Sequence, residues 1–595
     1  MTVRSAVGRR VRCDQAFVPR WKMVRTADPT LLALIAVVLL LCPGPAVAVA
    51  PRLVVVVAID QFPYEYLERF EPLFGPDGFR RLMRGGANYT ECRYGHLVTA
   101  TGPGHAVMLT GTDPVHNGIV NNTWYDRIDG QERGCVDDTR FPIVGLDDAG
   151  GAPHTGVSPL ALSTTTVGDG LRIATGLESK VVAVSIKNRA AVLMAGWRPN
   201  GAYWFDEGTC RFVTSTYYMS SLPSWVERFN GSKACASYVG RSWQRLRREE
   251  VYRRVADIDD APYEVPAYGL GRTFPHRVEE GTGADRFAAV VATPFGNDLV
   301  LRFAEAAVDA ERLGRNASAD LLLISFSSND LVGHAFGPHS QEVADITAHT
   351  DAVLAELMRF LDRKIGQGQW LLALTSDHGV APVPEHLEKL GVLQPRPDNY
   401  HFDVKAARTR VEQALTERFF DSQTPPDGFP GFFVSWGGRS DPFVWINAAA
   451  GKQLPKPLTY AALLAAIKEE IGQVEGVARV YAVPERAALA ASRDPFDQRA
   501  YRSWQLPNGG DLLIQLAPYW LPVEGGTAAT THKTTYEYDT HVPLLLYGSG
   551  IRAGRYDRSV GVTDLAPTLA DVLGIDAPPT ATGEVLREAL RGAGG

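Results

Sequence analysis

The sequence predicts an α/β fold built on a doubly wound, mostly parallel central sheet with helices on both faces. Short apolar runs rich in valine, isoleucine and leucine are typical of strands buried on both sides, as in a covered parallel sheet. Four such runs are Leu53–Ile59, Val181–Ile186, Leu321–Phe326 and Trp370–Thr375. Helical patterns lie between them, as a doubly wound fold requires; the clearest are Leu299–Arg312 and Val343–Lys364.

Each predicted strand is followed by a charged residue. In chain order these residues are Asp60, Lys187, Asp330 and Asp377. Ligands of doubly wound folds bind beyond the carboxyl ends of the strands. We therefore expect the chemistry of the protein at that edge of the sheet.

The chain has 595 residues, more than one compact core usually holds. We expect a catalytic domain over residues 51–595 that carries two insertions. The first, near residues 196–290, is rich in aromatic residues and is predicted to form a lid or a substrate wall. The second, near residues 382–510, mixes helical and strand patterns with many Pro and Gly. A C-terminal helix is predicted to open at Thr563–Leu569 and to include Leu573.

The composition is that of a folded protein without a basic surface. Hydrophobic residues make up 45% of the chain and charged residues 21%, which argues against disorder. The net charge of −7 offers no positive field for a polyanion, so nucleic acid is not an expected partner.

Residues 1–50 have the pattern of a secretory signal. Basic residues in the first 25 positions precede an apolar run, Leu31–Cys42, and a small-residue stretch, Ala46–Ala50. The run is shorter than the roughly 20 residues of a transmembrane helix, although an uncleaved N-terminal anchor is the alternative. A start at Met23 gives the basic region a normal length. We expect a periplasmic or secreted protein whose mature chain has no stable membrane span.

Removal of the signal leaves four cysteines in an oxidising compartment: Cys92, Cys135, Cys210 and Cys235. Four cysteines can form two disulfides in three connectivities. Proximity in the sequence favours Cys92–Cys135 and Cys210–Cys235. Because none has a Cys-x-x-Cys spacing, a cysteine zinc site is not expected.

Three aspartates and three histidines near strand ends are candidate metal ligands. They are Asp60, Asp330, His334, Asp377, His378 and His541. Taken singly, each has an ordinary explanation, such as a turn cap or a buried histidine. Together they supply the oxygen and imidazole donors that two zinc-type ions prefer. Carboxylates gathered without cations would repel one another, and bound divalent ions remove that difficulty.

Thr101 lies in the segment Thr99–His105, ahead of the apolar run Ala106–Leu109. Pro103 suits the first turn of a helix. Thr101 is then expected just before a helix N-terminus, where amide donors and the helix dipole favour a phosphate. The alternative is a capping threonine with no other role. A threonine hydroxyl becomes a nucleophile only when a base or a metal activates it.

These features resemble the alkaline phosphatase superfamily, and within it the phosphate-irrepressible alkaline phosphatases that use a threonine nucleophile. The nucleotide pyrophosphatases/phosphodiesterases are related to them. The matching segments follow the family's order across nearly all of the mature chain: Ala58–Gln61, Thr101–His105, His116–Asn122, Ser185–Arg189, Asn329–His334, Ser376–Gly379 and Tyr538–Pro543. The resemblance implies an alkaline-phosphatase-like fold.

The resemblance also implies a site with two zinc ions per chain. The first ion is expected at Asp60, Asp377, His378 and the nucleophile Thr101, and the second at Asp330, His334 and His541. The residues implied to contact the substrate phosphate are Asn122, Lys187 and Arg189. The sequence departs from the family pattern at Phe62, Asn188 and Lys533, where Thr531-His532-Lys533 replaces Thr-His-Gly. None of these departures removes an expected ligand.

Lys187 and Arg189 bear on the substrate class. Residues two apart in an extended segment point to the same side, so both cations are expected at one phosphate. A monoester carries more charge than a diester. Two charge-assisted contacts of about 1.5–3 kcal/mol each allow a preference of at most ~10²–10⁴-fold. A pair of solvated surface cations is the alternative.

The sequence thus predicts an exported zinc-dependent alkaline phosphatase that acts as a monomer on small phosphate monoesters through a phosphothreonine intermediate. A phosphodiesterase or nucleotide pyrophosphatase of the same superfamily is the alternative, and an inactive periplasmic protein that binds metal or phosphate is a further one. Thr101 lacks the Cys/Ser-x-Pro-x-Arg context that a sulfatase needs.

Overall fold

The computed structural model describes residues 50–146, 155–397, 400–420, 424–425, 427–436, 442–522 and 528–591. The predicted secretory signal, apart from Ala50, lies outside these residues. Within these ranges, no helix combines the length and the apolar character that crossing a bilayer requires.

A ten-stranded sheet forms the centre of the fold, in the order β19-β2-β18-β13-β1-β12-β7-β8-β9-β6. Its five middle strands are parallel: β13 (Trp370–Thr375), β1 (Leu53–Ile59), β12 (Asp320–Phe326), β7 (Val181–Ser185) and β8 (Gly201–Asp206). Antiparallel pairs extend both sides through β18 (Leu544–Gly548), β2 (Ala87–Tyr89), β9 (Arg211–Ser215) and β6 (Ile143–Val144), and β19 (Gly554–Tyr556) pairs parallel to β2. The four predicted strands are confirmed to within one residue at each end.

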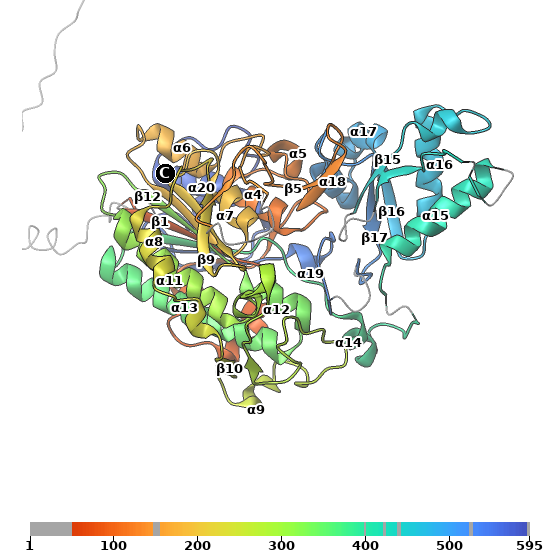
Figure 1. Cartoon of the computed structure of the whole chain (residues 1–595). Helices are drawn as coiled ribbons and strands as arrows, with labels where there is room; N and C mark the ends of the chain where they lie inside the picture. Colours follow the sequence, from red (N-terminus) through yellow and green to blue (C-terminus); the bar gives the residue numbers. More distant parts are fainter. Residues whose placement is uncertain are drawn as a thin grey trace, which may run out of the picture. The chain divides into compact units, whose positions relative to one another are not determined.

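Helices cover both faces of this sheet (Figure 1). Alternate residues of β1 enter two separate apolar cores: Val55 and Val57 face one, and Val54 and Val56 face the other. The first core includes α11 (Pro294–Glu311), α13 (Gln341–Lys364) and α8 (Ser224–Gly231). The second includes α4 (Thr101–Thr110), α7 (Asn188–Ala195), α6 (Val167–Ala174) and α20 (Leu565–Leu573). The predicted doubly wound α/β class, with its C-terminal helix, is therefore confirmed.

Shorter elements connect these layers. The helices are α2 (Glu65–Arg69), α3 (Phe79–Gly85), α5 (Pro114–Asn117), α9 (Glu249–Tyr252), α10 (Ala288–Val291), α12 (Ser328–Phe336), α14 (Pro384–Lys389), α17 (Arg486–Ala491), α18 (Pro495–Arg502) and α19 (Glu537–Thr540). The strand pairs are β3 (Cys92–Arg93) with β20 (Val560–Gly561), β4 (Thr123–Asp126) with β5 (Gln131–Gly134), and β10 (Ser242–Trp243) with β11 (His276–Arg277).

The aromatic segment near residues 196–290 differs from the prediction of a lid. Its first part forms β8 and β9, which continue the central sheet. Tyr203 and Trp225 are buried and pack against Phe303 of α11. These aromatic side chains belong to the core under the sheet, because apolar rings are more stable packed against a buried helix than exposed over a polar site.

The second predicted insertion contains a small sheet with its own core. The four strands are antiparallel: β14 (Phe433–Ser435), β15 (Phe443–Ile446), β17 (Leu512–Leu516) and β16 (Val477–Ala482). Helices α15 (Val404–Phe419) and α16 (Tyr460–Gly472) supply apolar side chains to the same core, and both lie beside this sheet in Figure 1.

One of the two predicted disulfides is confirmed and the other is wrong. Cys210 and Cys235 form a disulfide. Cys92 and Cys135 are free and buried within the described part of the chain. Cys92 lies on β3 opposite Val560, whereas the Cys135 sulfur lies beside Gly102, so a short sequence separation does not bring these thiols together.

Candidate active site

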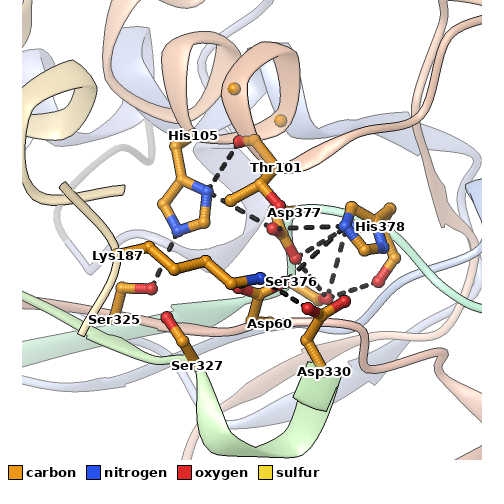
Figure 2. Close-up of polar contacts among 12 residues, drawn as sticks. Asp60, Thr101, His105, Lys187, Ser325, Ser327, Asp330, Ser376, Asp377 and His378 are labelled. Atoms are coloured by element: carbon orange, nitrogen blue, oxygen red, sulfur yellow. Dashed lines mark hydrogen bonds and ion pairs between the residues drawn. The ribbon is translucent and has the colours of Figure 1, made fainter. Parts of the chain in front are cut away.

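The parallel strands bring the predicted acidic residues together at their carboxyl ends. Asp60 directly follows β1, which lies between β13 and β12. Asp377 follows β13 by two residues, and Asp330 lies in the first turn of α12, just after β12. Figure 2 shows these three carboxylates around one centre, with His378 beside them. The His378 Nε2 atom lies 3.6 Å from Asp60 Oδ1 and 3.4 Å from Asp377 Oδ2.

Two groups of side chains at this point have the spacing of metal ligands. The first group consists of Asp60, Asp330 and His378, and the second of Asp330, His334 and His532. Within each group the donor atoms lie within 4.8 Å of one another. Asp330 belongs to both groups. The i, i+4 spacing of Asp330 and His334 places them on one face of α12, as the sequence suggests.

The second group differs from the prediction, because His532 replaces His541. The His532 Nε2 atom lies 3.8 Å from Asp330 Oδ1, and its ring stacks on His378 with 3.6 Å between centroids. His541 lies elsewhere: its Nε2 atom hydrogen-bonds the carbonyl oxygen of Thr90 at 2.7 Å, and its ring stacks on Tyr64. The structure therefore does not bring His541 into either group of candidate ligands.

The three histidines of the two groups are oriented in the same way. In each, Nδ1 bonds a backbone carbonyl: His334 to Thr530 at 2.9 Å, His378 to Gly379 at 2.9 Å and His532 to Thr99 at 2.7 Å. Since a carbonyl oxygen only accepts, Nδ1 carries the proton and Nε2 presents its lone pair to the group. Metal-bound histidines are held by this kind of second contact.

Buried polar atoms in the site lack ordinary partners. Asp60 Oδ1, Asp377 Oδ2 and His378 Nε2 have no hydrogen-bond partner among the described residues. Burial, with the neighbouring charge of Asp60, raises the pKa of Asp377 well above its usual value. Burial lowers the pKa of His378 to about 4, so its imidazole is neutral. Repelling carboxylates and neutral imidazoles fit divalent metal ions, with a nitrogen and oxygen donor set that suits zinc.

Thr101 is the first residue of α4, with Ala100 at the N-cap position. The helix thus begins one residue earlier than expected, and Pro103 still lies in its first turn. A β-carbon on Gly104 would fall 2.2 Å from the Asp377 carbonyl oxygen, so this glycine allows α4 to pack directly on the loop that carries Asp377 and His378. The close approach places Thr101 over the ligand cluster (Figure 2).

Two polar contacts fix the start of α4. The Asn122 Oδ1 atom accepts a 2.7 Å hydrogen bond from the Gly102 amide, which places the predicted phosphate-contacting amide beside Thr101. His105 bonds the Thr101 carbonyl oxygen through Nδ1 at 2.8 Å and the Ser325 hydroxyl of β12 through Nε2 at 2.9 Å. Burial lowers the pKa of His105 to about 4. This neutral histidine therefore ties the start of α4 to the central sheet, a role that the motif alone did not reveal.

Lys187 lies at the N-cap position of α7, and Arg189 is the second residue of that helix. The prediction of an extended segment is wrong here, because β7 ends at Ser185 and the helix begins at Asn188. The Lys187 Nζ atom lies 2.7 Å from Asp60 Oδ2 and 2.5 Å from Asp330 Oδ2. Burial lowers the pKa of Lys187, but these carboxylates outweigh it and the net pKa is raised. Its cation therefore reaches the centre of the site.

Comparison with known proteins agrees with this geometry. Residues 54–425 match the family model described as type I phosphodiesterase / nucleotide pyrophosphatase. Alkaline phosphatase PhoV of Synechococcus elongatus is 32% identical over 92% of this chain and 94% of its own. Alkaline phosphatase PafA of Elizabethkingia meningoseptica is 31% identical over 91% of this chain and 94% of its own.

A solved structure extends the agreement to the fold. The crystal structure of wild-type alkaline phosphatase PafA superimposes with a TM-score of 0.82 at 30% identity, covering 91% of this chain and 99% of that one. A PafA variant with a threonine changed to serine, and an asparagine, a lysine and an arginine changed to alanine, gives a TM-score of 0.81. The chain therefore belongs to the type I phosphodiesterase / nucleotide pyrophosphatase family, within the alkaline phosphatase superfamily that its motifs resemble.

Proposed function

We propose that this chain is an exported, zinc-dependent alkaline phosphatase that hydrolyses phosphate monoesters through a phosphothreonine intermediate. The observation that carries the proposal is the placement of Thr101, at a helix N-terminus, over two metal-ligand groups that share Asp330. Relatives named alkaline phosphatases align with more than nine-tenths of the chain, which supports phosphatase activity. Export rests on the predicted signal in residues 1–50.

Two zinc ions fit the donor set. One would be held by Asp60, Asp377 and His378, and the other by Asp330, His334 and His532. When bound, the ions supply Lewis-acid stabilisation of the charge on the reacting oxygens.

The residues of this chain then bind and orient the ester. The N-terminal ends of α4 and α7 present amide donors and positive dipole ends to a phosphoryl group. Asn122, Lys187 and Arg189 lie at or next to these ends, which supports a role for each in contacting phosphoryl oxygens. The altered PafA variant involves the same four residue types as Thr101, Asn122, Lys187 and Arg189, which supports these roles.

Covalent transfer follows from this placement. The Thr101 oxygen bonds the phosphorus atom as the bond from phosphorus to the ester oxygen breaks, and the proton of the threonine hydroxyl passes in net terms to that ester oxygen, which leaves as the alcohol. Water then attacks the phosphothreonine from the vacated side and releases inorganic phosphate, which restores the hydroxyl. His105 and Asn122 hold the first turn of α4 in place during both steps.

The charge at the phosphate site favours monoesters over the phosphodiesters of the alternative function. Purified zinc-loaded protein is expected to hydrolyse p-nitrophenyl phosphate with a kcat/KM about 10²- to 10⁴-fold above that for bis-p-nitrophenyl phosphate. Two charge-assisted contacts that a diester cannot fully use set this range. Steady-state rates on the two esters give the ratio. A diester rate equal to or above the monoester rate would contradict the assignment and favour a phosphodiesterase.

Lys187→Ala and Arg189→Ala are expected to lower monoester kcat/KM by at least about 10-fold each and diester kcat/KM much less. The reason is that each removes one charge-assisted contact to the extra phosphoryl charge. Zinc content is measured in parallel, because Lys187 also contacts two predicted ligands. Arg198→Ala, at an exposed position after α7, is the control and should keep the wild-type ratio. Equal losses on both esters would show that these cations do not select for charge.

A further inference from the structure

Gln61 follows Asp60 directly and contacts one aspartate of each proposed zinc site. It is 1% exposed. Its backbone amide donates to Asp377 Oδ1 at 3.1 Å, and its side-chain Nε2 donates to Asp330 Oδ1 at 2.8 Å. One residue therefore contacts an aspartate from each of the two predicted zinc sites.

The backbone of Gln61 has a conformation that few side chains adopt. Its φ angle is +59°, in the left-handed region that favours glycine. This turn directs the backbone N–H of Gln61 toward the Asp377 carboxylate, while the side-chain amide reaches the Asp330 carboxylate. The next residue, Phe62, donates its amide to the Ser376 hydroxyl and the His378 carbonyl, both at 2.9 Å. The strained turn is thus held by the same loop that carries Asp377 and His378, and strain kept at such a place points to a functional constraint.

Gly333 leaves the space that the Gln61 side chain occupies. A β-carbon on Gly333 would fall 1.8 Å from Gln61 Oε1, so any other residue there would displace the amide. The Oε1 atom itself has no hydrogen-bond partner among the residues described. A buried amide left half satisfied is costly for stability alone. This loss of stability is explained if the hydrogen bond from Nε2 holds the Asp330 carboxylate in position at the site.

We propose that Gln61 is a positioning residue that fixes the Asp330 carboxylate relative to Asp377, and that Gly333 is the complementary position that admits its amide. The inference rests on the proposed zinc-dependent function. Gln61 acts through the ligands and has no contact with substrate in this proposal. Glutamine is specific for the task, since glutamate lacks the N–H donor and repels Asp330, and asparagine is one methylene too short.

Gln61→Gly tests the proposal most directly, because glycine accepts the positive φ, keeps the backbone N–H bond to Asp377 and removes only the side-chain bond to Asp330. Zinc-loaded wild type and variant are mixed with excess EDTA, and released zinc is followed over time. We expect the zinc ion held by Asp330 to leave the variant about 10- to 100-fold faster, the range for loss of an outer-shell contact. The other ion should leave at the wild-type rate. Gln61→Asn should behave like Gln61→Gly, and Gln473→Gly, at an exposed position, is the control.

Gly333→Ala supplies the second half of a double-mutant cycle. Alone it should accelerate release of the same ion, because the added methyl group displaces the Gln61 amide. Combined with Gln61→Gly it should add no further loss, since no amide remains to collide with it. Additive losses, or unchanged release of both ions in Gln61→Gly, would overturn the inference. A wild type that retains no zinc would instead overturn the proposed function, so the two failures are distinguishable.

Discussion

Thr101→Ala is expected to lower kcat for p-nitrophenyl phosphate by about 10⁴- to 10⁶-fold, the scale seen when a covalent nucleophile is removed. Neighbouring hydroxyls are already engaged and should not substitute for it. The Thr99 hydroxyl donates to the Thr534 carbonyl at 2.8 Å, and the Ser376 hydroxyl donates to the His378 carbonyl at 2.6 Å. Zinc content should remain close to that of the wild type, because the aspartates and histidines of both groups are unchanged.

Thr101→Ser is the matched control for this prediction. Serine keeps the hydroxyl at the start of α4 and should retain far more activity than alanine. Rapid acid quenching during turnover, followed by peptide mass spectrometry, should place a phosphoryl group on Thr101 in the wild type and on the serine in the control. Substantial turnover by Thr101→Ala, or a phosphoryl group on another residue, would show that Thr101 is not the nucleophile.

The central fold is predictable because its signals are local and strong. β1 and β13 have the limits that their apolar runs suggest, since a strand buried on both faces has no polar residue until it leaves the sheet. The residues at those strand ends are equally predictable, because parallel strands align their carboxyl ends. Asp60, Asp330, Asp377 and His378 therefore meet, as the strand-end rule requires.

The remaining features depend on contacts between distant segments. The local sequence around Tyr203 and Trp225 does not indicate whether these aromatic side chains face a substrate or a helix. In the structure both pack against Phe303 of α11. The thiol of Cys92 lies on a strand that pairs with Val560, which no spacing rule anticipates. The contribution of Gln61 likewise needs the positions of Asp330 and Gly333, both about 270 residues away in the chain.

The choice between His532 and His541 shows the same limit at the site itself. Each histidine follows a threonine, and both lie near the C-terminal end of the matching motifs. The relevant signal in the sequence is Thr531-His532-Lys533, which differs from Thr-His-Gly only in its third residue. What distinguishes the two is the bond from His532 to the Thr99 carbonyl, 433 positions away in the chain. That contact turns the His532 Nε2 atom toward Asp330 and His334.

His532→Ala and His541→Ala form a matched pair that decides the composition of the second group. His532→Ala should lose about one zinc ion per chain and lower monoester kcat/KM by more than about 100-fold. Loss of a residue that only hydrogen-bonds a metal ligand costs about 10- to 100-fold, and loss of the ligand itself should cost more. His541→Ala should keep both ions, and its effect should be limited to about 1–2 kcal/mol of unfolding free energy from the lost Thr90 bond and Tyr64 stacking. Zinc analysis and kinetics on both variants provide the measurement. Loss of zinc from His541→Ala with retention in His532→Ala would reverse the assignment, because an imidazole whose Nε2 is bonded to the Thr90 carbonyl would then have to turn into the site.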